Sequence, residues 1–132
     1  MKQNILIIDD FASVRLYHMS YLSRKGYYCI GASSGSDALA QLEMHLVDLV
    51  LLDMVMPEMS GEDFIARLDA DPRFAHLPVL VITSEASVAQ AAFAGSRRPL
   101  QVLAKPVRPA ALLLCVQQLL PTPVVPAPAA AS

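Results

Sequence analysis

The sequence predicts an α/β fold in which one parallel sheet is covered by helices on both faces. Short aliphatic runs alternate with segments of helical periodicity five times along the 132 residues. The run that ends at Asp53 contains four consecutive aliphatic residues, which is typical of a strand buried on both faces of a parallel sheet. Alternating strands and helices of this length imply right-handed crossovers and a doubly wound architecture.

Five apolar runs are expected to form the strands, because each is short and bounded by turn-forming or polar residues. In chain order they cover residues 5–8, 27–30, 47–53, 78–82 and 100–104.

The segments between these runs are expected to form helices. The first has Val14, Tyr17, Tyr21 and Leu22 at helical spacing, and two cations and Gly26 mark its end. Ser60 is expected to cap the third helix, with Asp63 at the capping-box position, and Pro109 suits the first turn of the last helix. The predicted helices cover residues 11–25, 37–44, 61–70, 87–94 and 109–120.

Length and composition predict one globular domain over residues 1–120. Apolar residues make up 55% of the chain, which argues against disorder, while residues 121–132 are Pro/Ala-rich and read as a disordered tail or a truncated linker. No apolar run reaches the roughly 18 residues of a membrane span, and no signal peptide opens the chain, so a cytoplasmic protein without membrane insertion is expected.

Charge and cysteine content exclude further classes of function. The formal net charge of −2 gives no basic face for direct nucleic-acid binding, and the Arg97-Arg98 doublet is interpreted as a solvated helix end. Cys29 and Cys115 lie in apolar stretches without metal-ligand spacing, and they are interpreted as small core residues.

Reactive side chains follow four of the five predicted strands. They are Asp9 and Asp10 after the first, Asp53 at the end of the third, Thr83 after the fourth and Lys105 after the fifth. The carboxyl ends of parallel strands meet at one edge of a sheet, where such folds bind ligands, so these side chains are expected to converge.

The expected cluster suits metal-assisted phosphoryl transfer. Three carboxylates together repel one another and favour a bound cation, and oxygen ligands favour a hard ion such as Mg²⁺, with Mn²⁺ as an alternative. A lysine and a hydroxyl around a carboxylate would neutralise and bind the oxygens of a phosphoryl group placed on that carboxylate. Any one of these residues alone would be interpreted as a cap or a surface residue.

The chain resembles the receiver domain of bacterial two-component response regulators, of the chemotaxis-regulator type, over about residues 4–120. The matching pieces are Asp9-Asp10, Asp53 with Pro57 and Gly61 after it, Thr83-Ser84 and Lys105-Pro106. The resemblance implies a flavodoxin-like fold of five βα units with strand order 2-1-3-4-5.

The resemblance also implies a role for each site residue. Asp53 would accept a phosphoryl group from a phosphohistidine of a sensor kinase or a phosphotransfer protein, and Thr83 and Lys105 would bind the phosphoryl oxygens. Asp10, Asp53 and the backbone carbonyl of Val55 would hold Mg²⁺ directly, with Asp9 acting mainly through water. The Lys105-Pro106 peptide bond is expected to be cis. The protein would not turn over a separate substrate.

Two departures from the family pattern concern signal output through the face formed by the fourth helix, fifth strand and fifth helix, where a downstream protein is expected to bind. The family often has Tyr or Phe three residues before the lysine, where this chain has Val102. The family also commonly has Gly-Ala shortly before the fifth strand, at the positions of Arg98-Pro99 in this chain. The nearest glycine here, Gly95, lies three residues before the position expected for that glycine.

Three alternatives compete with a phosphorylated receiver. A degenerate receiver would act by protein contacts alone, but the acidic and lysine positions are intact. A haloacid-dehalogenase-like aspartyl phosphatase would carry a second Asp two residues after the nucleophile, where this chain has Val55. A flavodoxin-like nucleotide or flavin binder would have a phosphate loop in place of Asp9-Asp10-Phe11.

Overall fold

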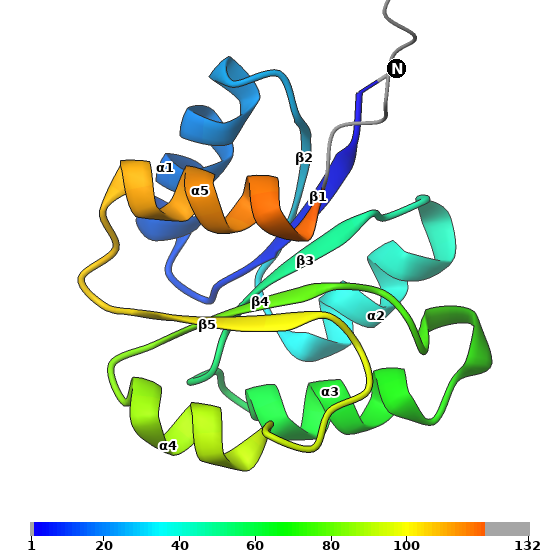
Figure 1. The fold of residues 1–132 in the computed structure, drawn as a ribbon. Helices are drawn as coiled ribbons and strands as arrows, with labels where there is room; N and C mark the ends of the chain where they lie inside the picture. Colours follow the sequence, from blue (N-terminus) through cyan, green and yellow to red (C-terminus); the bar gives the residue numbers. More distant parts are fainter. Residues whose placement is uncertain (1, 121–132) are drawn as a thin grey trace, which may run out of the picture.

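A computed structural model describes residues 2–120 of the chain and contains one sheet of five parallel strands (Figure 1). The sheet order is β2-β1-β3-β4-β5, which confirms the predicted topology. The strands are β1 (Asn4–Ile8), β2 (Tyr28–Ala32), β3 (Leu49–Asp53), β4 (Val79–Thr83) and β5 (Leu100–Ala104).

Helices cover both faces of the sheet. Figure 1 shows α1 and α5 on one face and α2, α3 and α4 on the other. Their bounds are α1 (Ala12–Arg24), α2 (Gly35–Met44), α3 (Gly61–Asp69), α4 (Ala86–Ala92) and α5 (Pro109–Leu119). A short 3₁₀ turn that the sequence did not predict, η1 (Pro72–Phe74), lies between α3 and β4, and Asp71 Oδ1 accepts a hydrogen bond from Arg73 N at its start.

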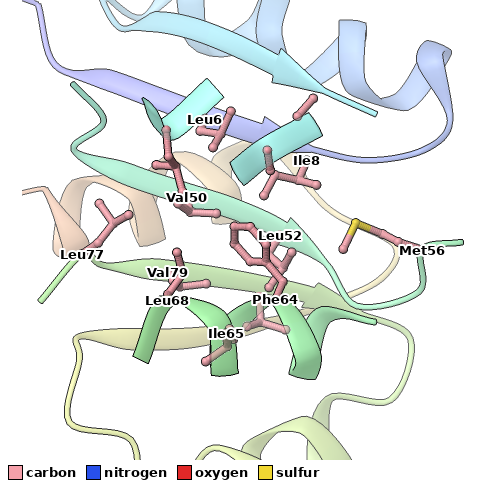
Figure 2. Packing of buried hydrophobic residues seen from close by; sticks show 14 of the residues in the cluster. Leu6, Ile8, Val50, Leu52, Met56, Phe64, Ile65, Leu68, Leu77 and Val79 are labelled. Carbon is pink, nitrogen blue, oxygen red and sulfur yellow. The ribbon is translucent and has the colours of Figure 1, made fainter. Parts of the chain in front are cut away.

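The core has two layers because successive side chains of a strand point to opposite faces of the sheet. In β3, where every residue is buried, Leu49 and Leu51 join a cluster with α1 and α5. Val50 and Leu52 join the second cluster, in which Phe64 of α3 is fully buried (Figure 2). Burial on both faces explains why this strand is apolar throughout until Asp53.

Serine side chains cap two helices, and the cap by Ser60 was predicted. Ser34 Oγ accepts a hydrogen bond from Asp37 N at the start of α2, and Ser60 Oγ accepts one from Asp63 N at the start of α3. Each satisfies a backbone donor that has no partner within its helix, and such a cap contributes about 1 kcal/mol.

The predicted apolar face of α1 was wrong in part. Tyr17 is 51% exposed and Val14 is also exposed, whereas His18 and Leu22 are the buried residues of the helix. His18 and Leu22 are four positions apart, so they share one stripe, and this stripe faces the sheet.

The interpretation of Arg98 as a solvated helix end was also wrong. Arg97 is exposed, but Arg98 is buried. The guanidinium of Arg98 donates to the carbonyls of Phe74 and Leu77 and to the carboxylate of Asp69. Its burial is tolerated because these acceptors satisfy it.

The cysteine interpretation holds, since Cys29 and Cys115 are free, half-buried thiols packed beside the α1/α5 cluster.

Among residues 2–120, no helix is long and apolar enough to cross a membrane. The expected Pro/Ala-rich tail, residues 121–132, lies outside the described part of the chain.

Candidate functional site

The predicted reactive residues gather at the carboxyl edge of the sheet. Asp53 is the last residue of β3 and is in register with Ile82 of β4. Thr83, the next residue of β4, is in register with Ala104, and Lys105 follows directly. The parallel register therefore places the ends of three neighbouring strands beside one another, as the sequence predicted.

Three carboxylates form an acidic cluster at this edge. Asp9, Asp10 and Asp53 each contribute one oxygen, and these oxygens all lie within 4.8 Å of one another. Asp9 and Asp53 are only 5% and 4% exposed. Burial raises the pKa of Asp9 above its ordinary value, the neighbouring charges of Asp53 and Asp10 add to this effect, and the Phe11 N–H and Lys105 partly oppose it.

The cluster has the features of a site for a hard divalent cation. Asp10 Oδ1 is a buried oxygen without a hydrogen-bond donor, and such an acceptor is free to bind an ion. Asp9 Oδ1 instead accepts a hydrogen bond of 2.9 Å from Phe11 N. An oxygen-only set of ligands of this kind fits Mg²⁺, which keeps several waters beside one or two carboxylates.

Two donors face the Asp53 carboxylate. Lys105 Nζ lies 3.3 Å from Asp53 Oδ1, and Val55 N donates to the same oxygen at 3.2 Å. The Lys105 side chain is 40% exposed, so its ammonium group is in contact with both solvent and a buried acid. The Lys105-Pro106 bond is cis, as the resemblance implied.

Thr83 is buried, and its Oγ1 accepts a hydrogen bond of 3.0 Å from Glu85 N. An accepting hydroxyl keeps its own hydrogen available to donate. Thr83 is therefore able to donate to a phosphoryl oxygen beyond the end of the sheet. This role of Thr83 and the role of the Val55 carbonyl as a metal ligand remain predictions.

One polar residue near the site was missed. His18 of α1 is 5% exposed and lines a cavity of about 260 Å³ together with Asp9, Lys105 and Pro106. Burial lowers the pKa of His18, and the charge of Lys105 lowers it further, although Asp53 opposes this. The spacing of four residues between His18 and Leu22 was the signal that could have placed this imidazole on the buried face.

Comparison with known proteins identifies the family. A family model described as the response regulator receiver domain matches residues 5–117. The chain belongs to this family. Receiver domains of two-component response regulators bind Mg²⁺ at an acidic pocket and interact with histidine kinases and downstream targets.

Individual receiver proteins match over most of the chain. A chemotaxis protein CheY from Pseudomonas aeruginosa is 38% identical, over 69% of this chain and 77% of its own length. A CheY1 protein from Helicobacter pylori is 33% identical, over 82% of this chain and 89% of its own length. The solved structure of CheY4 from Vibrio cholerae superimposes with a TM-score of 0.83 at 26% identity and covers 91% of this chain and all of its own.

Other relatives carry a receiver domain within a longer protein. The chain spans 6% of a histidine kinase from Formosa agariphila, to which it is 31% identical. It spans 34% of a probable transcriptional regulator from Guillardia theta and 19% of a probable cyclic di-GMP phosphodiesterase from Vibrio cholerae. Receiver domains thus occur with different outputs, and membership of the family does not assign one to this chain.

Proposed function

We propose that this receiver domain is a phosphorylation-controlled signalling module in which Asp53 accepts a phosphoryl group from a phosphohistidine. The donor would be a sensor histidine kinase or a histidine phosphotransfer protein in the cytoplasm. The chain would promote its own phosphorylation and dephosphorylation without turning over a separate substrate. A downstream protein would then bind the face formed by α4, β5 and α5.

The transfer step exchanges one bond to phosphorus for another. A carboxylate oxygen of Asp53 forms the new P–O bond, and the P–N bond to the donor imidazole breaks. The imidazole, protonated on its other ring nitrogen, leaves with the bonding electrons as a neutral ring. The charge of the carboxylate is cancelled as the imidazolium becomes neutral, and the transferred phosphoryl oxygens keep their negative charge, which positive groups stabilise.

The observation that carries the proposal is the environment of the Asp53 carboxylate. It is buried, it lies within 4.8 Å of two other acids, and Lys105 Nζ contacts it at 3.3 Å. Asp10, Asp53 and the Val55 carbonyl would hold Mg²⁺ directly, with Asp9 acting mainly through water. The ion supplies positive charge to the transferring group when bound. Lys105 would bind a phosphoryl oxygen from the other side, and the Val55 N–H would orient the accepting carboxylate.

Intact-mass measurement after incubation with acetyl phosphate and Mg²⁺ tests this function without a cognate kinase. Wild type should gain one phosphoryl mass, and Asp53→Asn should gain none. Asp63→Asn, which alters an exposed acid of α3, is the matched control and should be labelled like wild type. Equal labelling of wild type and Asp53→Asn contradicts the assignment, and an unlabelled wild type supports a degenerate receiver.

A further inference from the structure

Arg98, in the connection between α4 and β5, forms hydrogen bonds with two other segments of the chain. Its side chain is fully buried, and Nη1 donates to the carbonyls of Phe74 and Leu77, each at 2.8 Å. Nε and Nη2 donate to Asp69 Oδ1 at 3.2 and 2.5 Å. The connection that leads into β5 is therefore bonded to the end of α3, to η1 and to the segment between η1 and β4.

Displacement of the α4–β5 connection would break these hydrogen bonds and is therefore energetically unfavourable. A buried guanidinium that loses its acceptors leaves an uncompensated charge, so the loss of these contacts is strongly unfavourable. The planar fork of an arginine also fixes the direction of each bond, which an ammonium group does not. Residues on either side of Arg98 are thus restrained to one position against α3 and η1.

The helix before this connection is held much less firmly. Helix α4 has seven residues, and Ala89 alone among them is buried. An open groove of about 450 Å³ lies on its β5 side and one of about 320 Å³ on its α3 side, and both are lined by Phe93 and Ser96. Since close-packed interiors resist displacement, a helix with one buried residue and an open groove on each side has room to shift.

The start of α4 is connected to the site of phosphorylation. Thr83 Oγ1 accepts the Glu85 N–H, and Glu85 is the residue immediately before the helix. If the Thr83 hydroxyl donates to a phosphoryl oxygen while it accepts the Glu85 N–H, any displacement of the hydroxyl is passed to the residue before α4. The first turn of α4 would therefore respond to the phosphorylation of Asp53. The segment that follows the last turn of α4 leads to the restrained Arg98.

We propose that Arg98 is the fixed boundary of the segment that moves on phosphorylation. Residues 84–95 shift between the two grooves, and the Arg98 contacts keep residues 96–101 and 72–78 in place. This inference rests on the proposed function, because phosphorylation of Asp53 supplies the driving change. Movement is thereby confined to α4 and kept away from β5, whose Val102 carries no aromatic ring to reorient.

Amide hydrogen exchange with and without acetyl phosphate and Mg²⁺ tests the boundary, after intact mass has established the phosphorylated fraction. In wild type, residues 84–95 should change their exchange rate several-fold on phosphorylation, with 96–101 and 72–78 unchanged. Arg98→Lys keeps the charge but loses the fork, so the change should spread into both of those segments. Arg97→Lys, which alters the exposed neighbour, should behave like wild type.

Asp69→Asn provides a second variant that keeps the buried guanidinium and weakens only its half-exposed partner, in case Arg98→Lys does not fold. It should show the same spreading to a smaller extent. A phosphorylated wild type in which 96–101 changes together with 84–95 overturns the inference, as does either variant that keeps the wild-type pattern. Absence of a phosphoryl mass would instead contradict the proposed function.

Discussion

Lys105 Nζ lies 3.3 Å from Asp53 Oδ1, and the two side chains differ sharply in exposure, at 40% and 4%. The acid is fixed in the sheet, whereas the lysine is a flexible chain whose charged end reaches solvent. The ammonium group can therefore follow negative charge outward from the carboxylate to an attached phosphoryl group. This pair is the centre of the proposed phosphorylation chemistry.

Removal of Asp10 should weaken Mg²⁺ binding more than removal of Asp9. Asp10 Oδ1 is buried without a donor, which suits a direct ligand, while Asp9 Oδ1 already accepts the Phe11 N–H. Loss of an outer partner typically lowers metal affinity by about 10–100-fold, which is the effect expected for Asp9→Ala. Asp10→Ala should abolish measurable binding in an Mg²⁺ titration. A larger effect of Asp9→Ala would reverse the two roles.

Val55 should prolong the phosphorylated state. Its N–H contacts the Asp53 carboxylate, and Val55 is 74% exposed two residues after this acid, where we expect the attacking water to approach. Methyl groups cannot orient that water, whereas an amide can. After donor removal in the presence of Mg²⁺, phosphorylated Val55→Asn should decay several-fold faster than wild type. Equal decay rates would show that Val55 does not slow the hydrolysis of the acyl phosphate.

His18 should make folding stability depend on pH. Its pKa in the folded protein is below the ordinary value of 6.5, chiefly because burial disfavours the charged ring. The unfolded chain therefore binds more protons as the pH falls below 6.5, and stability is lost through this window down to the folded pKa. Urea unfolding at about pH 7.5 and about pH 5.5 measures the loss.

His18→Gln should reduce this loss, while His76→Gln, which alters an exposed histidine, should retain it. The same loss of stability on acidification in His18→Gln and wild type would mean that other groups cause it.

The two faces of α5 should differ in their contribution to stability. Leu112 is fully buried in the α1/α5 cluster, whereas Leu114, two positions away, is 55% exposed. Leu112→Ala should lower the free energy of unfolding by about 2–5 kcal/mol, because it leaves a cavity in the core. Leu114→Ala should change it by less than about 0.5 kcal/mol. Similar losses in both variants, measured by urea denaturation, would contradict the assigned orientation of the helix.

The sheet and its reactive edge could be predicted because they follow from local patterns. Strand β3 is apolar at every position until Asp53, and parallel topology then brings the strand ends together without any knowledge of side-chain packing. The cap by Ser60 was likewise visible within four residues of sequence. Such features depend on neighbours along the chain.

Features set by distant residues could not be predicted in the same way. Arg98 is buried among its acceptors Asp69, Phe74 and Leu77, which lie 21 to 29 residues away in the sequence. Nothing in the adjacent sequence distinguishes Arg98 from the exposed Arg97. The burial of His18 depends on how α1 is rotated against the sheet. Tyr17 and Val14 misled the choice of face because apolar residues also occur on the exposed side of a helix.

The most direct test of the account is to locate the phosphoryl group on the chain. Wild-type protein phosphorylated by acetyl phosphate with Mg²⁺ would be reduced with borohydride, which converts an aspartyl phosphate to homoserine, and its peptides would then be sequenced by mass spectrometry. The account predicts homoserine at position 53, with unmodified aspartate at 9 and 10. Homoserine at either of those positions, or a phosphorylated protein with intact Asp53, would contradict it.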